Sequence, residues 1–432
     1  MLSTRGQANA DQLDIPWRFA KGTTYDPQTN PGGLISFATA ENTLVQKELE
    51  DFASKIRIPG DAFRYAYCTA GGPRLPSAFA THINEYFNPH TTMTGDDIKV
   101  TAAATALHHV LAYSLCAPGE AILTTKPYYG RFEIDFGNEA GVKLIAAETD
   151  CEHCFDENVV EALEQKLNES EASGVKVRAL LIVNPNNPLG RCYPKRTLLS
   201  LLHFCATHSL HIISDEIYAL SVHPSHESNG SSSPPFTSIL SLNTSSIIDS
   251  NFVHVTYGLS KDFGAAGLKI GALITRNEEL KKAVHAVVRF HGTSGPSVAI
   301  ATAMLEDRVW CRNFIEIARQ RVKDAYAFIA SKLDALDIPY LEAYAGFFVY
   351  IDLSRHLPPE GEGRSVFERE CMLAQKMLEV GVFLHPGEEH GVREGWYRIV
   401  YTLDKRVVEE GMERLRRVLG GLKWEGGRER NF

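Results

Sequence analysis

Short apolar runs alternate with amphipathic segments over much of this chain. The runs that have the length and composition of strands are 98–101, 121–125, 142–145, 177–183 and 210–214. Segments with apolar residues at helical spacing lie before or between them, at 44–52, 77–86, 105–116, 158–170 and 194–208. Because strands that alternate with helices favour a parallel sheet, the pattern predicts an α/β fold with a mostly parallel central sheet and helices on both faces.

The pattern changes near residue 305. A helix is predicted at 310–336, long enough to connect two domains, followed by strands at 346–353 and 396–402 and helices at 367–380 and 407–419. We therefore predict an N-terminal arm with part of a small domain at 1–60, a large domain at 61–304 and a small C-terminal α/β domain at 305–432. The loop at 223–237 and the tail at 425–432 are polar, and we expect both to lie in solvent.

Composition narrows the class of protein. The chain has 432 residues, 44% hydrophobic and 22% charged, with a net charge of −9, which disfavours nucleic acid and anionic membranes as partners. It lacks a signal peptide and an apolar run long enough to span a bilayer. The spacing of its eight cysteines does not indicate a set of disulfide bonds. We therefore expect a cytoplasmic protein with reduced thiols. The cluster Cys151-Glu-His-Cys154 has no second ligand pair, so we interpret it as a polar loop and predict no metal site.

The apolar run 253–257 leads into a Ser-Lys pair, Ser260-Lys261, then into a Gly-rich loop and a further apolar run. This order predicts strand, loop and strand, with Lys261 at the end of a buried strand. A desolvated amine has a lowered pKa and can attack a carbonyl, as the lysine of a pyridoxal phosphate (PLP) enzyme does. Taken alone, the stretch fits a surface lysine in a loop slightly better.

Polar residues recur after the other predicted strands, where ligands of open parallel sheets bind. The small-residue turn 101–105 precedes a helix, and its backbone N–H groups suit a phosphate. Tyr129 could present its ring face to a planar group or fill the core. The Asn-Pro loop 184–190 can direct the amide of Asn187 outward.

Two further features complete the set. An acidic pair begins at Asp215, directly after a buried strand, and such a carboxylate needs a cation, for which a protonated pyridine nitrogen is suitable. Tyr218 could donate to the same ring, and Arg398 on a small-domain strand could bind a carboxylate with two hydrogen bonds. A helix cap, a packed tyrosine and a surface arginine are the ordinary alternatives, but chance matches at all six features in this order are implausible.

Over nearly its whole length the chain resembles the class I/II aminotransferases, PLP enzymes of fold type I. The resemblance rests on Asn184-Pro-Asn-Asn-Pro-Leu-Gly190, Ser214-Asp-Glu-Ile-Tyr218 and Leu259-Ser-Lys-Asp-Phe-Gly264. The opening Asn30-Pro-Gly-Gly-Leu-Ile35 and Ala40-Glu-Asn42 resembles that of the 1-aminocyclopropane-1-carboxylate (ACC) synthase-like subgroup. These motifs are specific for cofactor and fold, and much less specific for the reaction.

The resemblance implies a role for each candidate residue. Lys261 would carry the internal aldimine and move the α-proton, and Asp215 would keep the pyridine nitrogen protonated. Asn187 and Tyr218 would bond the phenolate oxygen, and Tyr129 would stack on the ring.

The remaining roles concern the phosphate, the substrate and a second subunit. Ala104, Thr105 and Ser260 would hold the phosphate. Arg398 would take the substrate α-carboxylate, with Glu41 near the substrate. Tyr67 resembles the tyrosine that reaches a neighbouring subunit's phosphate, which implies a homodimer with shared sites.

Two positions depart from the family pattern. Gly258 stands where a serine is common, and Lys269 stands where an arginine is common on the strand after the Gly-rich loop. Lysine lacks the guanidinium fork and glycine lacks a hydroxyl, so we expect the phosphate to be bound less tightly.

Three reactions share the same quinonoid intermediate: transamination, carbon–sulfur β-elimination and ACC synthesis. We expect an enzyme that acts on an α-amino acid or a cysteine conjugate in specialised metabolism, transaminating or eliminating, because the chain resembles fungal proteins of gliotoxin-type toxin pathways. ACC synthesis ranks third, because the phosphate cup and the segment 37–39 depart from the plant pattern. A PLP-binding regulator is disfavoured, because an arm of about thirty residues is too short for a DNA-binding domain.

Overall fold

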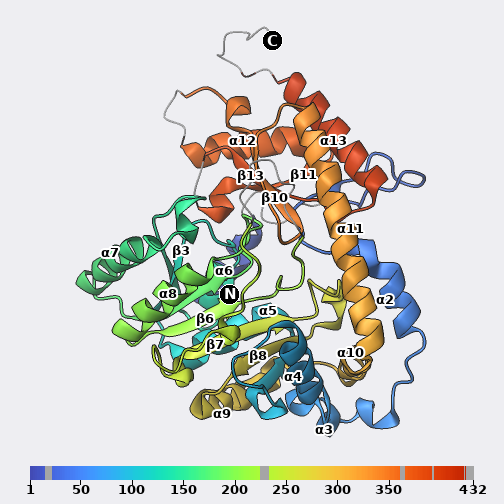
Figure 1. Ribbon diagram of the computed structural model, residues 1–432. Coiled ribbons are helices and arrows are strands. Elements are labelled where there is room, and N and C mark those ends of the chain that lie inside the picture. The colour runs from blue at the N-terminus through green and yellow to red at the C-terminus, as the bar shows by residue number, and fades with distance from the viewer. Residues whose placement is uncertain (15–21, 224–232, 361–364, 392–393, 423, 425–432) are drawn as a thin grey trace.

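The computed structural model describes residues 1–14, 22–223, 233–360, 365–391, 394–422 and 424. They form a large unit built on one sheet and a smaller unit that contains the C-terminal strands and helices (Figure 1). The predicted boundaries at 60/61 and 304/305 remain predictions. In the described part of the chain, no helix has the length and apolarity needed to cross a membrane.

A seven-stranded sheet forms the centre of the large unit, in the order β2-β8-β7-β6-β5-β3-β4. The strands are β2 (Ile98–Thr101), β3 (Ala121–Thr125), β4 (Lys143–Ala147), β5 (Val177–Val183), β6 (His211–Asp215), β7 (Val253–Gly258) and β8 (Gly271–Thr275). β8 runs antiparallel to both of its neighbours, and the other described pairings are parallel. The prediction of a mostly parallel sheet is confirmed.

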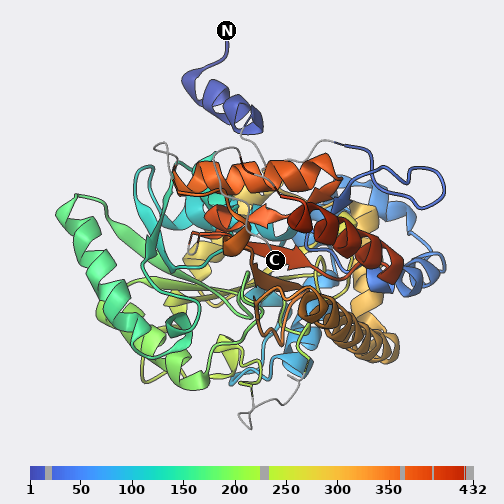
Figure 2. The ribbon, with the colours of Figure 1, turned by 90° about the horizontal axis from the view of Figure 1, so that it is seen from above.

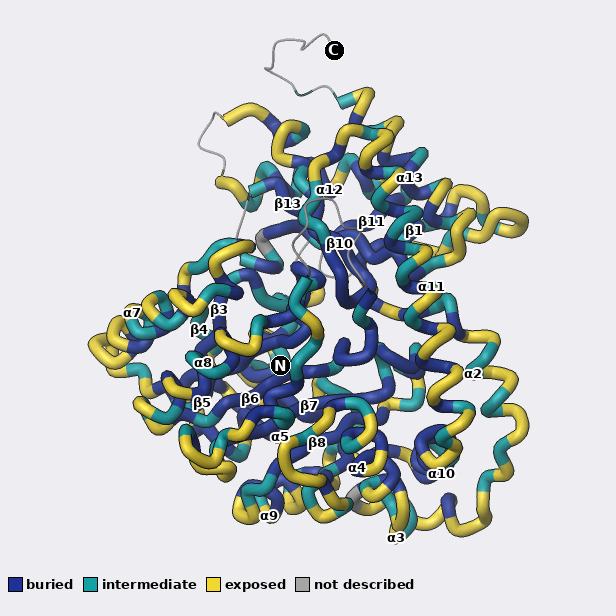
Figure 3. Tube along the Cα trace, viewed as in Figure 1, coloured by how far each residue is buried: buried dark blue, intermediate teal, exposed yellow. Residues whose placement is uncertain are grey.

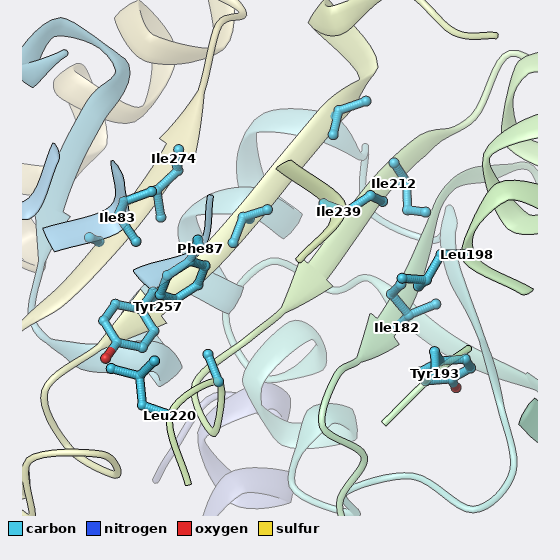
Figure 4. Packing of buried hydrophobic residues seen from close by; sticks show 14 of the residues in the cluster. Ile83, Phe87, Ile182, Tyr193, Leu198, Ile212, Leu220, Ile239, Tyr257 and Ile274 are labelled. Carbon is cyan, nitrogen blue, oxygen red and sulfur yellow. The ribbon is translucent and has the colours of Figure 1, made fainter. Parts of the chain in front are cut away.

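Helices cover both faces of this sheet, so its strands carry apolar residues on both sides. Along β6, Ile212 packs into one core and Ile213 into the opposite one. The first core includes Ile83, Leu198 and Tyr257, and it is the one drawn in Figure 4. Figure 3 shows the strands buried and the outer helices exposed on their solvent side.

The helices divide between the two faces. One face is covered by α4 (Leu75–Tyr86), α7 (Val159–Ala172), α8 (Lys195–Thr207) and α10 (Gly295–Glu306). The other is covered by α5 (Ala103–Leu115), α6 (Phe132–Gly137) and α9 (Glu278–Val287). The apolar residues that predicted helices at 77–86, 105–116, 158–170 and 194–208 lie on these buried faces, and each helix begins and ends within a few residues of its prediction.

The small unit has a four-stranded antiparallel sheet in the order β12-β13-β10-β9. Its strands are β9 (Tyr340–Leu341), β10 (Phe348–Asp352), β12 (His385–Pro386) and β13 (Trp396–Val400), and its helices are α12 (Val366–Glu379) and α13 (Lys405–Gly420). Near the N-terminus, β1 (Ile35–Ser36) pairs in parallel with β11 (Val382–Phe383). The segment after residue 34 thus packs with the C-terminal unit.

Helix α11 (Arg308–Ala335) runs along one side of the molecule, from the large unit to the small one (Figure 1). Its first half contributes Phe314 to the core of the large unit, and its second half contributes Ile329 to the core of the small unit. The long helix predicted at 310–336 therefore connects the two cores.

The N-terminal segment contains helices that were not predicted from the sequence. Helix α1 (Thr4–Asp11) has no buried residue and projects from the body of the molecule (Figure 2). Further along, the helix predicted at 44–52 begins with a 3₁₀ turn (Thr43–Val45) and continues as α2 (Gln46–Ala53), and a one-turn helix, α3 (Tyr65–Cys68), follows. The tail 425–432 and most of the loop 223–237 lie outside the described residues.

Candidate active site

A cavity of about 1000 Å³ lies between the two units, beside the carboxyl ends of β5 and β6 and against β13. The predicted site residues that line it are Glu41, Ala104, Thr105, Tyr129, Asn187, Asp215, Tyr218, Ser260, Lys261, Lys269 and Arg398. Tyr67 lies on α3 and is not among the lining residues of this chain. Segments far apart in the sequence thus converge on one site.

Lys261 follows β7 in a short loop, and its amine donates a 2.6 Å hydrogen bond to the carbonyl of Ala40. The amine lies 5.9 Å from the centre of the Tyr218 ring. Burial, followed by the charge of Arg398, lowers the pKa of Lys261 to about 8, although the carboxylates of Glu41 and Asp215 oppose this shift. With a pKa of about 8, about a tenth of the amine is neutral at pH 7, far more than for an ordinary lysine, and the neutral form is the nucleophile.

Asp215 ends β6 and is almost completely buried. The hydroxyl of Thr256, its partner across the β6–β7 pairing, donates a 3.0 Å hydrogen bond to Oδ1. On the other side, Nε2 of His108 lies 3.5 Å from Oδ2. The carboxylate is therefore oriented by two neighbours and directed into the cavity that it lines.

His108 lies one turn into α5, between two carboxylates. Its Nδ1 lies 2.9 Å from Oδ2 of Asp135, while its Nε2 faces Asp215. Burial alone would lower the pKa of His108, but hydrogen bonds and charge from Asp135 and Asp215 outweigh it and raise the pKa to about 9. His108 was not among the residues predicted from the sequence, although the histidine pair 108–109 interrupts an otherwise apolar helix.

Arg398 projects from β13, and its guanidinium is buried. Nη1 donates to Oδ1 of Asn187 at 2.9 Å, and Nη2 donates to the carbonyl of Ala38. Nε has no hydrogen-bond partner within the described part of the chain. Burial lowers the pKa of Arg398 from its usual value, so this cation favours an anionic ligand in the cavity.

Two tyrosines form further walls. Burial raises the pKa of Tyr218 far above its usual value, and its ring meets Phe347 and Phe348 edge-on, so the phenol stays protonated and able to donate. Tyr129 packs edge-on against Phe132, and burial raises its pKa as well. Both side chains line the cavity.

The first turn of α5 provides an anion-binding edge. Ala103 has φ of +70°, and Ala104 and Thr105 follow it at the helix N-terminus, where N–H groups are free of intrahelical partners. Gly271 allows this turn to approach β8, because a Cβ there would lie 2.8 Å from the carbonyl carbon of Ala103. The geometry of the turn suits a phosphate, and its phosphate-binding role remains a prediction.

The structure shows where the two residues that depart from the family pattern lie, and it explains one of them. Lys269 does not lie on a strand, contrary to the pattern used for it; it lies in the loop before β8 with φ of +53°. A Cβ at Gly258 would lie 2.8 Å from the carbonyl oxygen of Ile270, because β7 and β8 approach closely there. Glycine at 258 is thus dictated by backbone packing.

The cavity also contains groups that the sequence did not reveal. Arg131, Phe383 and His385 line it together with Arg398, and the imidazole of His385 contacts the carboxylate of Glu389. Arg131 lies in the turn before α6, and Phe383 and His385 lie on two-residue strands, so no periodic pattern places them from the sequence. Cys151 and Cys154 are buried and do not line the cavity, and burial raises the pKa of Cys154 well above its usual value, which agrees with an unreactive thiol.

The residues fit PLP. Asp215 supplies a buried carboxyl group for a pyridinium, the α5 N-terminus and Lys269 supply positive potential for a phosphate, and the Lys261 amine lines the same cavity. The unpartnered Nε of Arg398 shows that the guanidinium still has donor capacity for a carboxylate.

Comparisons with known proteins agree with this geometry. The sequence model of aminotransferase class I and II matches residues 66–415. The chain is 32% identical over 433 residues to the human "1-aminocyclopropane-1-carboxylate synthase-like protein 1", covering 97% of this chain and 83% of that protein. It is 30% identical to "Probable aminotransferase aclI" of Aspergillus oryzae, covering 97% and 98%.

Among solved structures, the aspartate aminotransferase from Thermus thermophilus with maleate is similar with a TM-score of 0.76 and 22% identity, covering 97% and 99% of the two chains. At this identity the similarity concerns the fold. The match over residues 66–415 shows that the chain belongs to the class I and II aminotransferases, a family of PLP-dependent enzymes.

Proposed function

We propose that this enzyme acts on an α-amino acid or a cysteine conjugate, by transamination or by carbon–sulfur β-elimination. The observation that carries the proposal is the pairing, in one cavity, of the Lys261 amine, whose pKa is near 8, with the buried guanidinium of Arg398. An amine that can exchange protons and a cation that can bind a carboxylate are what an α-amino acid substrate requires.

PLP, when bound, supplies an electron sink for the carbanion formed at the substrate α-carbon. Arg398 then binds the α-carboxylate and orients the α C–H bond, using the donor that is unpartnered in this structure. Lys261 takes the α-proton, since its lowered pKa lets the amine act as a base near neutral pH.

The surrounding residues hold charge and exclude water. Asp215, buried and held by contacts with Thr256 and His108, places a carboxyl group where a cation beside it is favoured. Tyr218 donates through its hydroxyl, and Tyr129 forms an apolar wall of the cavity.

We place this chemistry in specialised, toxin-type metabolism. The support is the similarity over nearly the full length of both chains to the fungal protein named "Probable aminotransferase aclI". The similarity covers the segments that carry every proposed site residue, but the reaction after α-proton removal depends on substrate groups that a fold does not specify.

Three substrate mixtures separate the candidate reactions. The holoenzyme is incubated with amino acids plus 2-oxoglutarate, with cysteine S-conjugates, and with S-adenosylmethionine. Glutamate formation supports transamination, and release of a thiol with pyruvate and ammonia supports β-elimination. Lys261→Ala should abolish both, and ACC as the sole product would overturn the proposal.

ACC synthesis from S-adenosylmethionine is the second candidate. It is favoured by the cavity-lining position of Glu41, next to the Ala40 carbonyl that accepts from Lys261, and by the similarity to the ACC synthase-like human protein. Glu41→Gln should reduce γ-elimination most if this candidate is correct, and should leave transamination of simple amino acids less affected.

We also propose a homodimer with shared sites. Tyr67 lies outside the lining of its own chain's cavity, and the large apolar side chains of Phe63 and Tyr65 beside it are exposed. Sedimentation should give twice the chain mass, and Tyr67→Ala should weaken PLP retention without changing that mass.

A further inference from the structure

Outside the cavity, three side chains with metal-ligand atoms meet at the surface. They are His109 of α5, Glu139 just after α6, and His291 just after the 3₁₀ turn Val288–Phe290. One ligand atom of each lies within 4.8 Å of the other two. His109 Nε2 lies 3.2 Å from Glu139 Oε2, and the two imidazole centroids are 4.6 Å apart.

We propose that His109, Glu139 and His291 form a binding site for a divalent transition-metal ion of the zinc class. Nitrogen and carboxylate ligands at about 2.0–2.2 Å from zinc lie roughly 3.3 Å from one another in a tetrahedron. The 3.2 Å separation of His109 and Glu139 already matches this value, and His291 needs to move by at most about 1.5 Å. Water would complete the coordination.

The donor set selects the class of cation. Two imidazoles and one carboxylate suit zinc and its neighbours among the transition metals, whereas calcium and magnesium prefer oxygen ligands alone. The His109 side chain is only 11% exposed and is therefore held in place, while Glu139 is 66% exposed and can adjust to the ion. Solvent thus gives the ion access without any opening of the core.

The position of the cluster gives the ion a structural effect. The carbonyl of His291 accepts a 2.8 Å hydrogen bond from the N–H of Ala102, in the turn that leads into α5. A metal held by the His291 imidazole would add a second connection between this segment and α5. None of the three ligands lines the active-site cavity, so the site is distinct from the PLP-binding residues.

The simpler interpretation is a polar contact between His109 and Glu139, with His291 nearby by packing. The two interpretations differ in the role of His291, because this contact does not need it. They also differ in the response to Glu139→Gln, since the amide keeps a hydrogen bond to His109 but is a weak zinc ligand.

The test uses PLP-loaded enzyme that has been stripped with a chelator, desalted and dialysed against micromolar zinc chloride. Bound zinc is measured by mass spectrometry for wild type, His291→Ala and Glu139→Gln. His285→Ala, which removes an exposed histidine of α9 outside the cluster, is the matched control.

We expect both ligand variants to bind zinc more weakly by over about tenfold, since the loss of even a supporting hydrogen bond to a ligand has that effect. The control should bind as wild type does. In wild type and control, but not in the ligand variants, zinc should raise the melting temperature and cobalt(II) should give the visible spectrum of a tetrahedral site. Equal zinc binding by all four proteins, or no zinc binding by wild type, would overturn the proposal. If His291→Ala does not fold, the comparison of Glu139→Gln with wild type is the test.

Discussion

Asp215 is a buried carboxylate whose charge is balanced within the protein. His108 lies between it and Asp135, so two anions share one imidazole that is protonated up to about pH 9. Removing one partner of a buried ion pair is costly, because the remaining charge is left without compensation. His108 therefore stabilises the fold and places a positive charge beside Asp215.

Replacing His108 with Asn should lower the free energy of unfolding of the apoprotein by about 3 kcal/mol near pH 6. Because the folded-state pKa of His108 is raised, its contribution is fully present below about pH 6.5 and is lost as pH rises through about 9. Denaturant titrations should therefore show the difference between the two proteins shrinking by about pH 10. A difference independent of pH would contradict this explanation, and His285→Asn should match wild type throughout.

The amine of Lys261 predicts the pH dependence of cofactor attachment. Only the neutral amine attacks the aldehyde of PLP, so the rate of attachment to apoprotein should rise about tenfold per pH unit below about 8 and level off above it. The visible absorbance of the attached cofactor measures this rate. Because the Arg398 charge lowers the pKa of Lys261, Arg398→Gln should move the curve to higher pH; an unshifted curve would refute the electrostatic coupling.

Arg398→Lys tests the bidentate role of the guanidinium. Lysine keeps the charge but cannot hold Asn187, the Ala38 carbonyl and a carboxylate at once. Loss of one charge-assisted hydrogen bond, about 2 kcal/mol, should reduce kcat/KM for an α-amino acid roughly 30-fold. The exposed Arg406→Lys on α13 should leave kcat/KM unchanged, and an equal effect from both substitutions would rule out a specific role.

At the scale of elements, the close pairing of β7 and β8 explains a departure from the family. Gly258→Ser would restore the common hydroxyl, but its Cβ would lie 2.8 Å from the Ile270 carbonyl oxygen. We expect a loss of about 1–3 kcal/mol in the free energy of unfolding and no gain in PLP affinity. Gly267→Ser, in the following loop with no atom within 4 Å of its added Cβ, is the control for both measurements. Tighter PLP binding by Gly258→Ser would show that β8 can give way.

Elements buried on both faces were the most predictable from sequence. β2, β3 and β5 match their predicted ranges, because a short apolar run flanked by turns usually forms a buried strand in an α/β protein. β9, β11 and β12 have two residues each and α6 has six, so they contain too little of any period to be detected. The antiparallel direction of β8 could not be predicted either, because an apolar run does not indicate how a strand is oriented relative to its neighbours in the sheet.

At the scale of the whole molecule, the site was predictable where its chemistry follows a strand end. Lys261, Asp215 and Asn187 lie in one cavity because the carboxyl edge of a parallel sheet brings strand ends together. His108 and Thr256 were missed because their importance comes from contact with Asp215; the histidine pair 108–109 marks its helix as unusual but does not indicate that contact, and Thr256 is ordinary within its strand. Contacts between distant segments require the register, which hydrophobic patterning does not provide.

The connection between the two units can be tested along α11. The ring of Phe314 stacks on Phe263 at 5.6 Å, and Phe263 lies two residues after Lys261, whereas Ile329 is buried in the core of the small unit. Phe314→Ala should cost about 3–5 kcal/mol and Ile329→Ala about 2–5 kcal/mol. Only Phe314→Ala should also speed the release of PLP, because it removes support from the loop that holds the amine. Ile317→Ala, at an exposed position of the same helix, should change neither quantity, and equal PLP release from all three variants would show that the Lys261 loop does not depend on this contact.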